Sequence, residues 1–181
     1  MYQTVDVADP VAVHEFAQAV QQMGIPVELL VNNAGVFIPG QISDEPSGVF
    51  EQTMHTNVFS AYYLTRALVG DMITRRRGHI INVCSTASVT AYANGGSYCV
   101  SKFALLGMSK VLREELKPHN IRVTSVLPGA TLTQSWAGTE LPSERFMPAE
   151  DVARVIMTAY QLSDRSVIEE ILLRPQLGDI G

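Results

Sequence analysis

The chain has 181 residues, of which 46% are hydrophobic, and a formal net charge of −5 at pH 7. This length is that of a single domain, and the hydrophobic fraction is sufficient for a substantial core. The negative charge argues against a nucleic-acid-binding surface. No apolar stretch approaches the roughly 18 residues of a membrane span, and no signal peptide is recognisable. We therefore expect a cytoplasmic protein that binds neither nucleic acid nor membrane.

Short apolar runs alternate with longer amphipathic segments along the chain. This alternation is typical of an α/β fold in which helices cover both faces of a parallel sheet. A first helix is expected after Asp9, a capping residue, with Pro10 at its first position and Gly24 at its end. Further helices are expected at residues 47–76, 96–117 and 148–162. Strands are expected at residues 3–7, 27–31, 80–83, 121–127 and 167–174.

Neither the cysteines nor the histidines suggest a metal site. Cys84 and Cys99 form no Cys-x-x-Cys pair and are expected to be free thiols. The histidines have no metal-ligand spacing, so we predict no metal. The run from Arg75 to Arg77 is interpreted as a solvated helix end, where the macrodipole favours positive charge.

Tyr98 and Lys102 are four residues apart on the expected helix 96–117, so they share one of its faces. A phenol has a pKa of about 10 and is a poor acid or base at neutral pH. An ammonium group on the next helical turn favours the phenolate, so we expect Lys102 to lower the pKa of Tyr98. Ser85 follows a strand and can hydrogen-bond the same substrate oxygen as Tyr98. Such groups suit a ketone that accepts a hydride, because its oxygen then develops negative charge and must be given a proton. Since no side chain can donate a hydride, this reaction requires a cofactor.

Three further motifs accompany these residues: Asn57 upstream, Asn32-Asn33-Ala34-Gly35 after an apolar strand, and Pro128-Gly129 after another. The combination resembles the short-chain dehydrogenase/reductase family. The resemblance implies a doubly wound, mostly parallel, Rossmann-like sheet. It also implies an oxidoreductase that moves a hydride between NAD or NADP and a small carbonyl or alcohol substrate.

The resemblance also implies roles for individual residues. The catalytic residues would be Asn57, Ser85, Tyr98 and Lys102, with Asn57 holding a water that links the lysine to solvent. The cofactor-binding residues would be Asp6, Val7, Asn33, Ala34, Gly35, Tyr98, Lys102, Thr131 and Thr133. The substrate pocket would include Tyr92, Asn94 and the Trp136 loop, and residues 131–147 would form a mobile substrate lid. Family members usually pair through two long helices, here near 57–76 and 98–117, which implies a homodimer or homotetramer. Apolar residues of these helices could extend a contact surface beyond the sheet: Tyr62, Tyr63, Leu64, Leu105, Leu106 and Met108.

Some of these residues also have simpler explanations. Asn33 and Gly35 could form an ordinary turn after a strand, and Asn57 could be a solvated helical residue. Thr86 and Ser88 could replace Ser85 in its role. The Pro128-Gly129 pair could merely break the chain after a strand.

The family normally begins with a strand, a Thr-Gly-x-x-x-Gly-x-Gly turn, a helix and a second strand, and this sequence contains none of them. That turn places backbone N–H groups and a helix N-terminus against the cofactor pyrophosphate. Residues 1–181 are therefore interpreted as a single, N-terminally truncated domain that lacks its first βαβ portion. We expect this chain alone to bind NAD(P)H weakly and to expose the flank of the strand at 3–7. The alternative is a decayed fragment that acts as a cofactor-free binding or structural protein.

Overall fold

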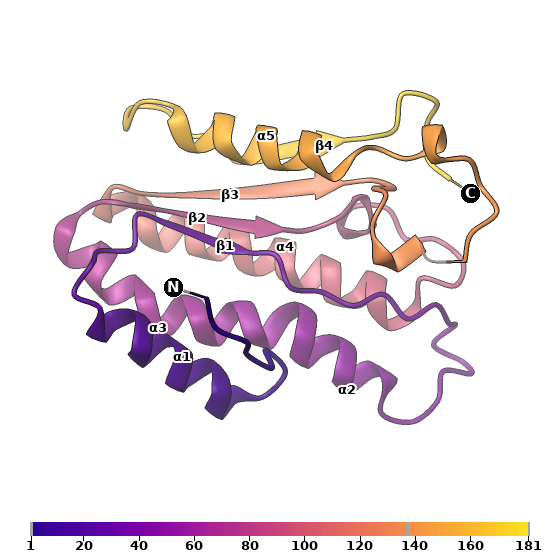
Figure 1. The fold of residues 1–181 in the computed structure, drawn as a ribbon, viewed down its shortest axis with the longest axis horizontal. Helices are drawn as coiled ribbons and strands as arrows, with labels where there is room; N and C mark the ends of the chain where they lie inside the picture. Colours follow the sequence, from indigo (N-terminus) through magenta and orange to yellow (C-terminus); the bar gives the residue numbers. More distant parts are fainter. Residues whose placement is uncertain (1, 137, 181) are drawn as a thin grey trace.

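The computed structural model describes residues 2–136 and 138–180. Four parallel strands form one sheet in the order β1-β2-β3-β4. The strands are β1 (Leu29–Asn32), β2 (Gly78–Val83), β3 (Ile121–Pro128) and β4 (Glu170–Leu173). Helices α1 (Pro10–Gln22), α3 (Ser60–Arg75) and α4 (Gly96–Leu116) lie on one side of the sheet, and α5 (Ala149–Gln161) lies on the other (Figure 1). The predicted Rossmann-like α/β fold is confirmed.

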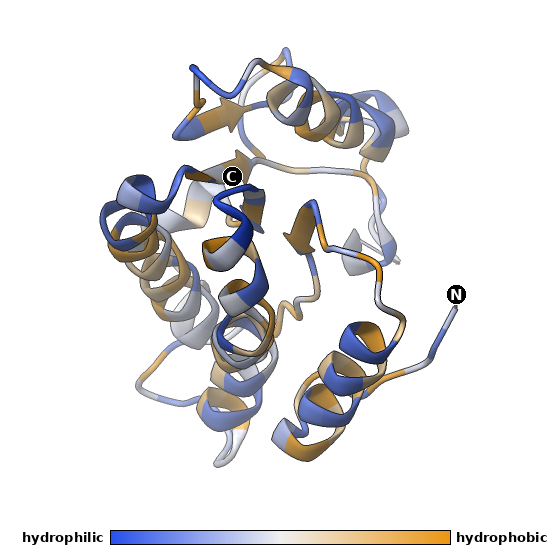
Figure 2. Ribbon diagram, turned by 90° about the vertical axis from the view of Figure 1, so that its left-hand side faces the viewer, coloured by the Kyte–Doolittle hydropathy of each residue, from blue (hydrophilic) through white to orange (hydrophobic). Residues whose placement is uncertain are grey.

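The two central strands are covered on both faces. All of β2 except its last residue is buried, as are six of the eight residues of β3. Strands buried on both faces read as nearly continuous apolar runs, which is why their positions are predictable from the sequence. Figure 2 shows the hydrophobic strands inside and helices that turn hydrophilic residues outward.

The predicted strand at residues 3–7 is wrong. Residues 3–6 have no regular structure, and residues 7 and 8 form a turn. A strand requires a neighbour for its backbone hydrogen bonds, and this segment pairs with no strand in the described part of the chain. It leads instead into α1, where the Asp9 carboxylate accepts a hydrogen bond from the Val11 N–H at 2.8 Å.

The predicted helical region 47–76 consists of three consecutive pieces. Helix α2 (Val49–Met54) runs into a π-helical turn, η1 (His55–Phe59), which continues as α3. Single π turns inside α-helices are frequent at functional sites. This turn contains Asn57, whose side chain is buried.

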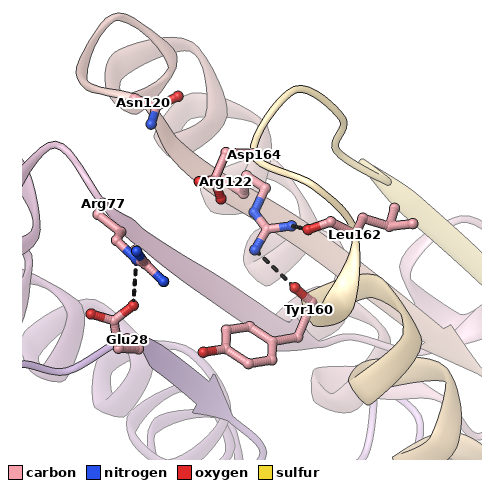
Figure 3. Close-up of a pocket in the computed structure, with 8 residues that line it drawn as sticks. Glu28, Arg77, Asn120, Arg122, Tyr160, Leu162 and Asp164 are labelled. Carbon is pink, nitrogen blue, oxygen red and sulfur yellow. Dashed lines mark hydrogen bonds and ion pairs between the residues drawn. The ribbon is translucent and has the colours of Figure 1, made fainter.

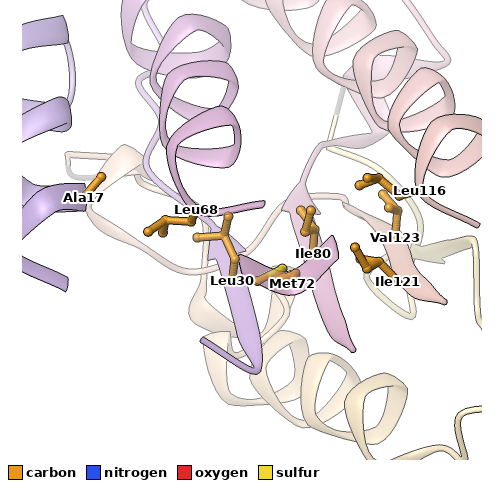
Figure 4. Packing of buried hydrophobic residues seen from close by; sticks show 8 residues of the cluster. All are labelled: Ala17, Leu30, Leu68, Met72, Ile80, Leu116, Ile121 and Val123. Atoms are coloured by element: carbon orange, nitrogen blue, oxygen red, sulfur yellow. The ribbon is translucent and has the colours of Figure 1, made fainter. Parts of the chain in front are cut away.

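Apolar side chains from the sheet and from α1, α3 and α4 form the main core (Figure 4). Met72 and Ile80 are completely inaccessible to solvent. Burying an aliphatic side chain of this size stabilises the fold by about 1.5–3 kcal/mol. The cluster therefore fixes the helices on the sheet; its members are Ala17, Leu30, Leu68, Met72, Ile80, Leu116, Ile121 and Val123.

A line of buried polar side chains crosses the same face of the sheet. The Asn32 amide donates to Asn82 Oδ1 at 2.8 Å and to Thr65 Oγ1 at 3.2 Å. The Asn82 amide donates in turn to Ser109 Oγ at 2.8 Å. Because a buried polar group without a partner is costly, these bonds disfavour any shift of β1, β2, α3 and α4 relative to one another.

A polar hollow of about 210 Å³ lies at the amino ends of the strands (Figure 3). Its arginines have structural partners. Arg77 pairs with Glu28, and Arg122 donates to the carbonyl oxygens of Tyr160 and Leu162, at the end of α5. The arginine run is thus more than a solvated helix end, because Arg75 also pairs with Glu28 and ties α3 to the segment before β1.

His79 is a fully buried histidine on the α5 side of the sheet. Thr124 Oγ1 donates its proton to the Ile168 carbonyl oxygen, so it must accept a hydrogen bond from His79 Nε2 at 2.7 Å. Nδ1 is buried without a partner in the described part of the chain. Burial, together with the positive charge of Arg122, lowers the pKa of His79 to about 4. His79 is therefore neutral at pH 7.

This burial predicts a specific acid sensitivity. The pKa of His79 is about 4 when folded and about 6.5 when unfolded, so its contribution to stability is complete above pH 6.5 and declines as the pH falls toward 4. The loss should reach about 3 kcal/mol. In His79→Gln, the free energy of unfolding measured by urea titration should depend less on pH across this range. His14→Gln, at an exposed histidine, is the control and should leave the slope unchanged; equal slopes in all three proteins would contradict the assignment.

Candidate active site

A cavity of about 450 Å³ opens beyond the carboxyl ends of β1, β2 and β3. Open α/β sheets bind ligands at this edge. Each strand contributes the residues that follow it, and α4 contributes two side chains from its first two turns. The lining residues from these elements include Asn33, Gly35, Ser85, Thr86, Tyr98, Lys102, Gly129, Thr131 and Thr133.

Ser85 lies two residues after the end of β2, in extended conformation, and caps the short helix η2 (Thr86–Ser88). Its Oγ accepts a hydrogen bond from the Ala87 N–H at 3.1 Å, and its hydroxyl hydrogen-bonds the Tyr98 phenol. Ser88 has a different role, since its buried Oγ accepts from the Ser85 N–H at 3.2 Å and does not line the cavity. Of the two competing hydroxyls, Thr86 alone shares the cavity with Ser85.

Tyr98 lies in the first turn of α4, with its ring edge-on to Phe37 at a centroid distance of 4.9 Å. Burial raises the pKa of its phenol above the ordinary value, and hydrogen bonding by the Ser85 hydroxyl opposes that rise. The expected lowering of the pKa of Tyr98 is therefore wrong, because its pKa is raised. Desolvation of the phenolate is the largest cause of the rise.

Lys102 is itself buried, with 5% of its surface exposed. Its ammonium group donates to the Val83 carbonyl oxygen at 3.0 Å and lies 5.7 Å from the centre of the Tyr98 ring. Burial lowers the pKa of Lys102 to about 8. The ammonium form thus still predominates at pH 7.

Asn57 is not a solvated helical residue, because only 1% of its surface is exposed. Its Oδ1 accepts from the Val36 N–H at 2.8 Å, and its Nδ2 donates to the Val36 carbonyl oxygen at 3.0 Å and to Ser101 Oγ at 2.9 Å. Ser101, which sequence reasoning missed, donates in turn to the Tyr98 carbonyl oxygen at 2.7 Å. Asn57 therefore lies behind the cavity and ties the loop after β1 to the helix that carries Tyr98.

Glycine at position 35 leaves room for this arrangement. A Cβ added at Gly35 would lie 3.4 Å from Asn57 Oδ1 and 3.5 Å from Lys102 Nζ. The first distance is close to the lower limit of ordinary packing, so a larger side chain would occupy the space in front of the lysine. The Asn33–Gly35 segment is thus more than a turn, since both of these residues line the cavity.

The remaining predicted cofactor residues divide into two groups. Thr131 and Thr133 line the cavity, whereas Ala34, Asp6 and Val7 do not. The Asp6 carboxylate accepts a hydrogen bond from the Ala8 N–H at 2.9 Å, and its carbonyl oxygen accepts from the Asp9 N–H. Asp6 and Val7 thus belong to the turn that starts α1, because no strand carries them to the edge of the sheet.

The rim of the cavity is partly apolar. Tyr92 and Trp136 line it as predicted, but Asn94 does not; its carbonyl oxygen accepts from the Gly40 N–H at 3.1 Å. Asp179 and Ile180, near the C-terminus, also line the cavity, which the sequence did not indicate. The two ends of the predicted lid are joined by a bridge between Thr131 and Met147.

Within residues 2–136 and 138–180, no cluster of three or more His, Cys, Asp or Glu side chains has the geometry of a metal site. Among the same residues, no helix combines the length and the hydrophobicity that crossing a membrane requires.

Comparisons with known proteins agree with this fold. A family model described as short chain dehydrogenase matches residues 1–142. The chain is 36% identical to sepiapterin reductase of Chlorobaculum tepidum over 179 residues, which cover 98% of this chain and 73% of that protein. It is 36% identical to the uncharacterized oxidoreductase YusZ of Bacillus subtilis, covering 82% of this chain but only 52% of YusZ. The crystal structure of a metagenomic short-chain oxidoreductase in complex with NADP is similar with a TM-score of 0.82 and 31% identity, over 96% of this chain and 73% of that one.

The buried contacts of Asn57 predict a strong effect on stability. Asn57→Ala removes the partners of the Val36 backbone groups and of Ser101, so the free energy of unfolding should fall by about 3 kcal/mol. Asn33→Ala is the matched control, because Asn33 is exposed and no side-chain hydrogen bond of it is present in the described part of the chain; it should change stability by less than about 0.5 kcal/mol. Chemical denaturation measures both, and equal effects would contradict the structural role of Asn57.

Proposed function

The chain belongs to the short-chain dehydrogenase family, and from this premise we propose that its cavity is the active site of an NAD(P)-dependent oxidoreductase for carbonyl or alcohol substrates. The observation that carries the proposal is the meeting of Ser85, Tyr98 and Lys102 around one cavity. These residues come from two different elements, and the packing of a sheet does not require them to meet.

The residues around the cavity suit the nicotinamide end of such a cofactor. Gly35 keeps the space in front of Lys102 open, and Asn33, Thr131 and Thr133 supply polar groups around it. The cavity volume lies within the range of small-molecule sites, about 300–1,000 Å³. NAD(P)H, when bound, would supply the hydride. The residues of the chain would hold and orient cofactor and substrate and would protonate the substrate oxygen.

Tyr98 is the proposed general acid in carbonyl reduction. Burial raises the pKa of the phenol, so it is protonated at pH 7, and the ammonium group of Lys102 would favour release of that proton to the substrate. Negative charge that develops on a carbonyl oxygen would accept this proton, while the O–H of Ser85, beside the phenol, would donate to the same oxygen. Lys102 would stabilise the resulting phenolate, because its ammonium group already lies beside the Tyr98 ring.

In the reverse direction Tyr98 would act as the base. Asn57 would keep the loop and α4 in place through Ser101, as a supporting residue behind the cavity. The partly apolar rim formed by Tyr92 and Trp136 favours substrates that place an apolar group beside the carbonyl.

We also propose that the protein forms a homodimer through α3 and α4. A groove of about 430 Å³ lies between these helices and includes Tyr62, Met108 and Val111. Tyr62 and Val111 are 44% and 56% exposed, respectively. Leu105 and Leu106, by contrast, are buried in the core and offer no contact surface. A twofold arrangement would cover the same patch on both copies.

The first prediction for this function separates the phenol from the rest of the site. Tyr98→Phe should lower turnover of NADPH with a panel of small ketones and aldehydes by about 100-fold or more, because the proton donor is lost. Its dissociation constant for NADPH should change little. Tyr92→Phe is the matched control, since Tyr92 lines the same cavity. Both should be measured on this chain and on a fusion that carries a glycine-rich cofactor segment ahead of Met1; full turnover in Tyr98→Phe would refute the assignment.

The dimer is tested by placing charge in the groove. Val111→Arg should convert the protein to a monomer in light scattering, because the arginine would lose its hydration in an apolar contact. Val11→Arg places the same charge on α1, at a residue that is 65% exposed, and should leave the assembly unchanged. A wild-type monomer would rule out this part of the proposal.

A further inference from the structure

Helix α4 carries Tyr98 but has no side-chain cap of its own, since the residue at its N-cap is Gly95. A carboxylate from a distant loop takes that place. Glu45, in the segment between β1 and α2, accepts a hydrogen bond from the Ser97 N–H at 2.8 Å through Oε1. Ser97 Oγ donates to Oε2 of the same carboxylate. Both contacts are made by the residue immediately before Tyr98.

Two glycines provide the space for this carboxylate. A Cβ added at Gly96 would collide with Glu45 Oε1 and would lie 2.6 Å from the Gly40 carbonyl oxygen. A Cβ added at Gly40 would lie 2.8 Å from Cγ of Glu45. Gly96 also has a φ of +29°, which side chains rarely adopt. The backbone on both sides of the contact is therefore shaped around Glu45.

The same loop touches the start of α4 in other ways. Gly40 and Gly95 form an isolated bridge, and the Phe37 ring packs edge-on against the Tyr98 ring. Ser97 is 2% exposed, so its contacts with Glu45 are shielded from water on that side. A negative charge also interacts favourably with the N-terminal end of a helix, and hydrogen bonds to a carboxylate are stronger than neutral ones.

We propose that Glu45 is a positioning residue for the reaction, which holds the first turn of α4 so that the Tyr98 hydroxyl faces Ser85. This inference rests on the proposed function. Glu45 does not line the cavity. Its effect reaches the reaction through Ser97 and the backbone of α4. Small displacements of a reacting group lower rates steeply, by about a hundredfold for 1 Å.

Four variants test the proposal, each on the 181-residue chain and on the fusion that carries a glycine-rich cofactor segment ahead of Met1. Glu45→Ala removes both contacts, Glu45→Gln keeps an acceptor for the Ser97 N–H, and Ser97→Ala removes only the hydroxyl. Asp44→Ala is the matched control, because Asp44 is an exposed carboxylate in the same loop. Amide hydrogen exchange of residues 97–99 and the nuclear Overhauser contact between the Phe37 and Tyr98 rings report the position of the first turn without any activity. Circular dichroism verifies that each variant is folded at the assay temperature.

Glu45→Ala should speed exchange of the Ser97 amide roughly tenfold, as expected for loss of a helix cap, and should weaken the ring contact. Its kcat should fall about a hundredfold, with the KM for NADPH within about twofold of wild type. Glu45→Gln should recover most of the exchange protection and most of kcat. Ser97→Ala should give values between those of Glu45→Ala and wild type, and Asp44→Ala should match wild type. Unchanged exchange in Glu45→Ala, or faster exchange with unchanged kcat, would overturn the proposal. A wild-type fusion without turnover would refute the proposed function instead, and the exchange and ring contact would still decide whether Glu45 holds Tyr98.

Discussion

The ammonium group of Lys102 lies in the protein interior, where the described residues offer it the Val83 carbonyl oxygen at 3.0 Å as hydrogen-bond partner. A buried charge is costly unless polar groups compensate it, so this bond constrains how α4 can lie on the sheet. The carbonyl belongs to the last residue of β2, directly before the turn that presents Ser85. Fixing Lys102 against the end of β2 therefore brings the turn of α4 that carries Tyr98 to the same edge.

The position of α4 is reinforced at both ends of its contact with the sheet. Toward the middle of the helix, Ser109 accepts from the Asn82 amide, which is part of the buried polar line across the strands. Toward its start, Ser101 joins Asn57 to the Tyr98 carbonyl oxygen. Sliding of the helix by one residue would break all of these bonds together, and each buried group left unpaired costs about 1–3 kcal/mol. Directional polar contacts thus set the register, and the apolar core supplies most of the attraction.

The sequence predicted best what depends on local pattern. The central strands and α4 lie close to their expected positions, because continuous apolar runs and a long amphipathic segment need no knowledge of distant contacts. The strand at 3–7 failed for the opposite reason, since a strand exists only with a partner. Glu45 was missed because its contact with Ser97 spans 52 residues. Only an indirect sequence signal could have indicated the role of Glu45: a glycine at position 40, near Glu45, and another at position 96, at the start of α4.

The loop after β1 both lines the cavity and holds the start of α4. Its first residues, Asn33 and Gly35, line the cavity, and its later residues hold the start of α4. In between, the Val36 backbone is bonded to Asn57 at both its N–H and its carbonyl oxygen. A group held at several points along one loop loses less freedom when a ligand binds, so less binding energy is spent on ordering it. The orientation of Tyr98 is therefore determined largely by contacts outside its own helix, which come from the loop after β1. The residues of this loop after Gly35 match no sequence motif.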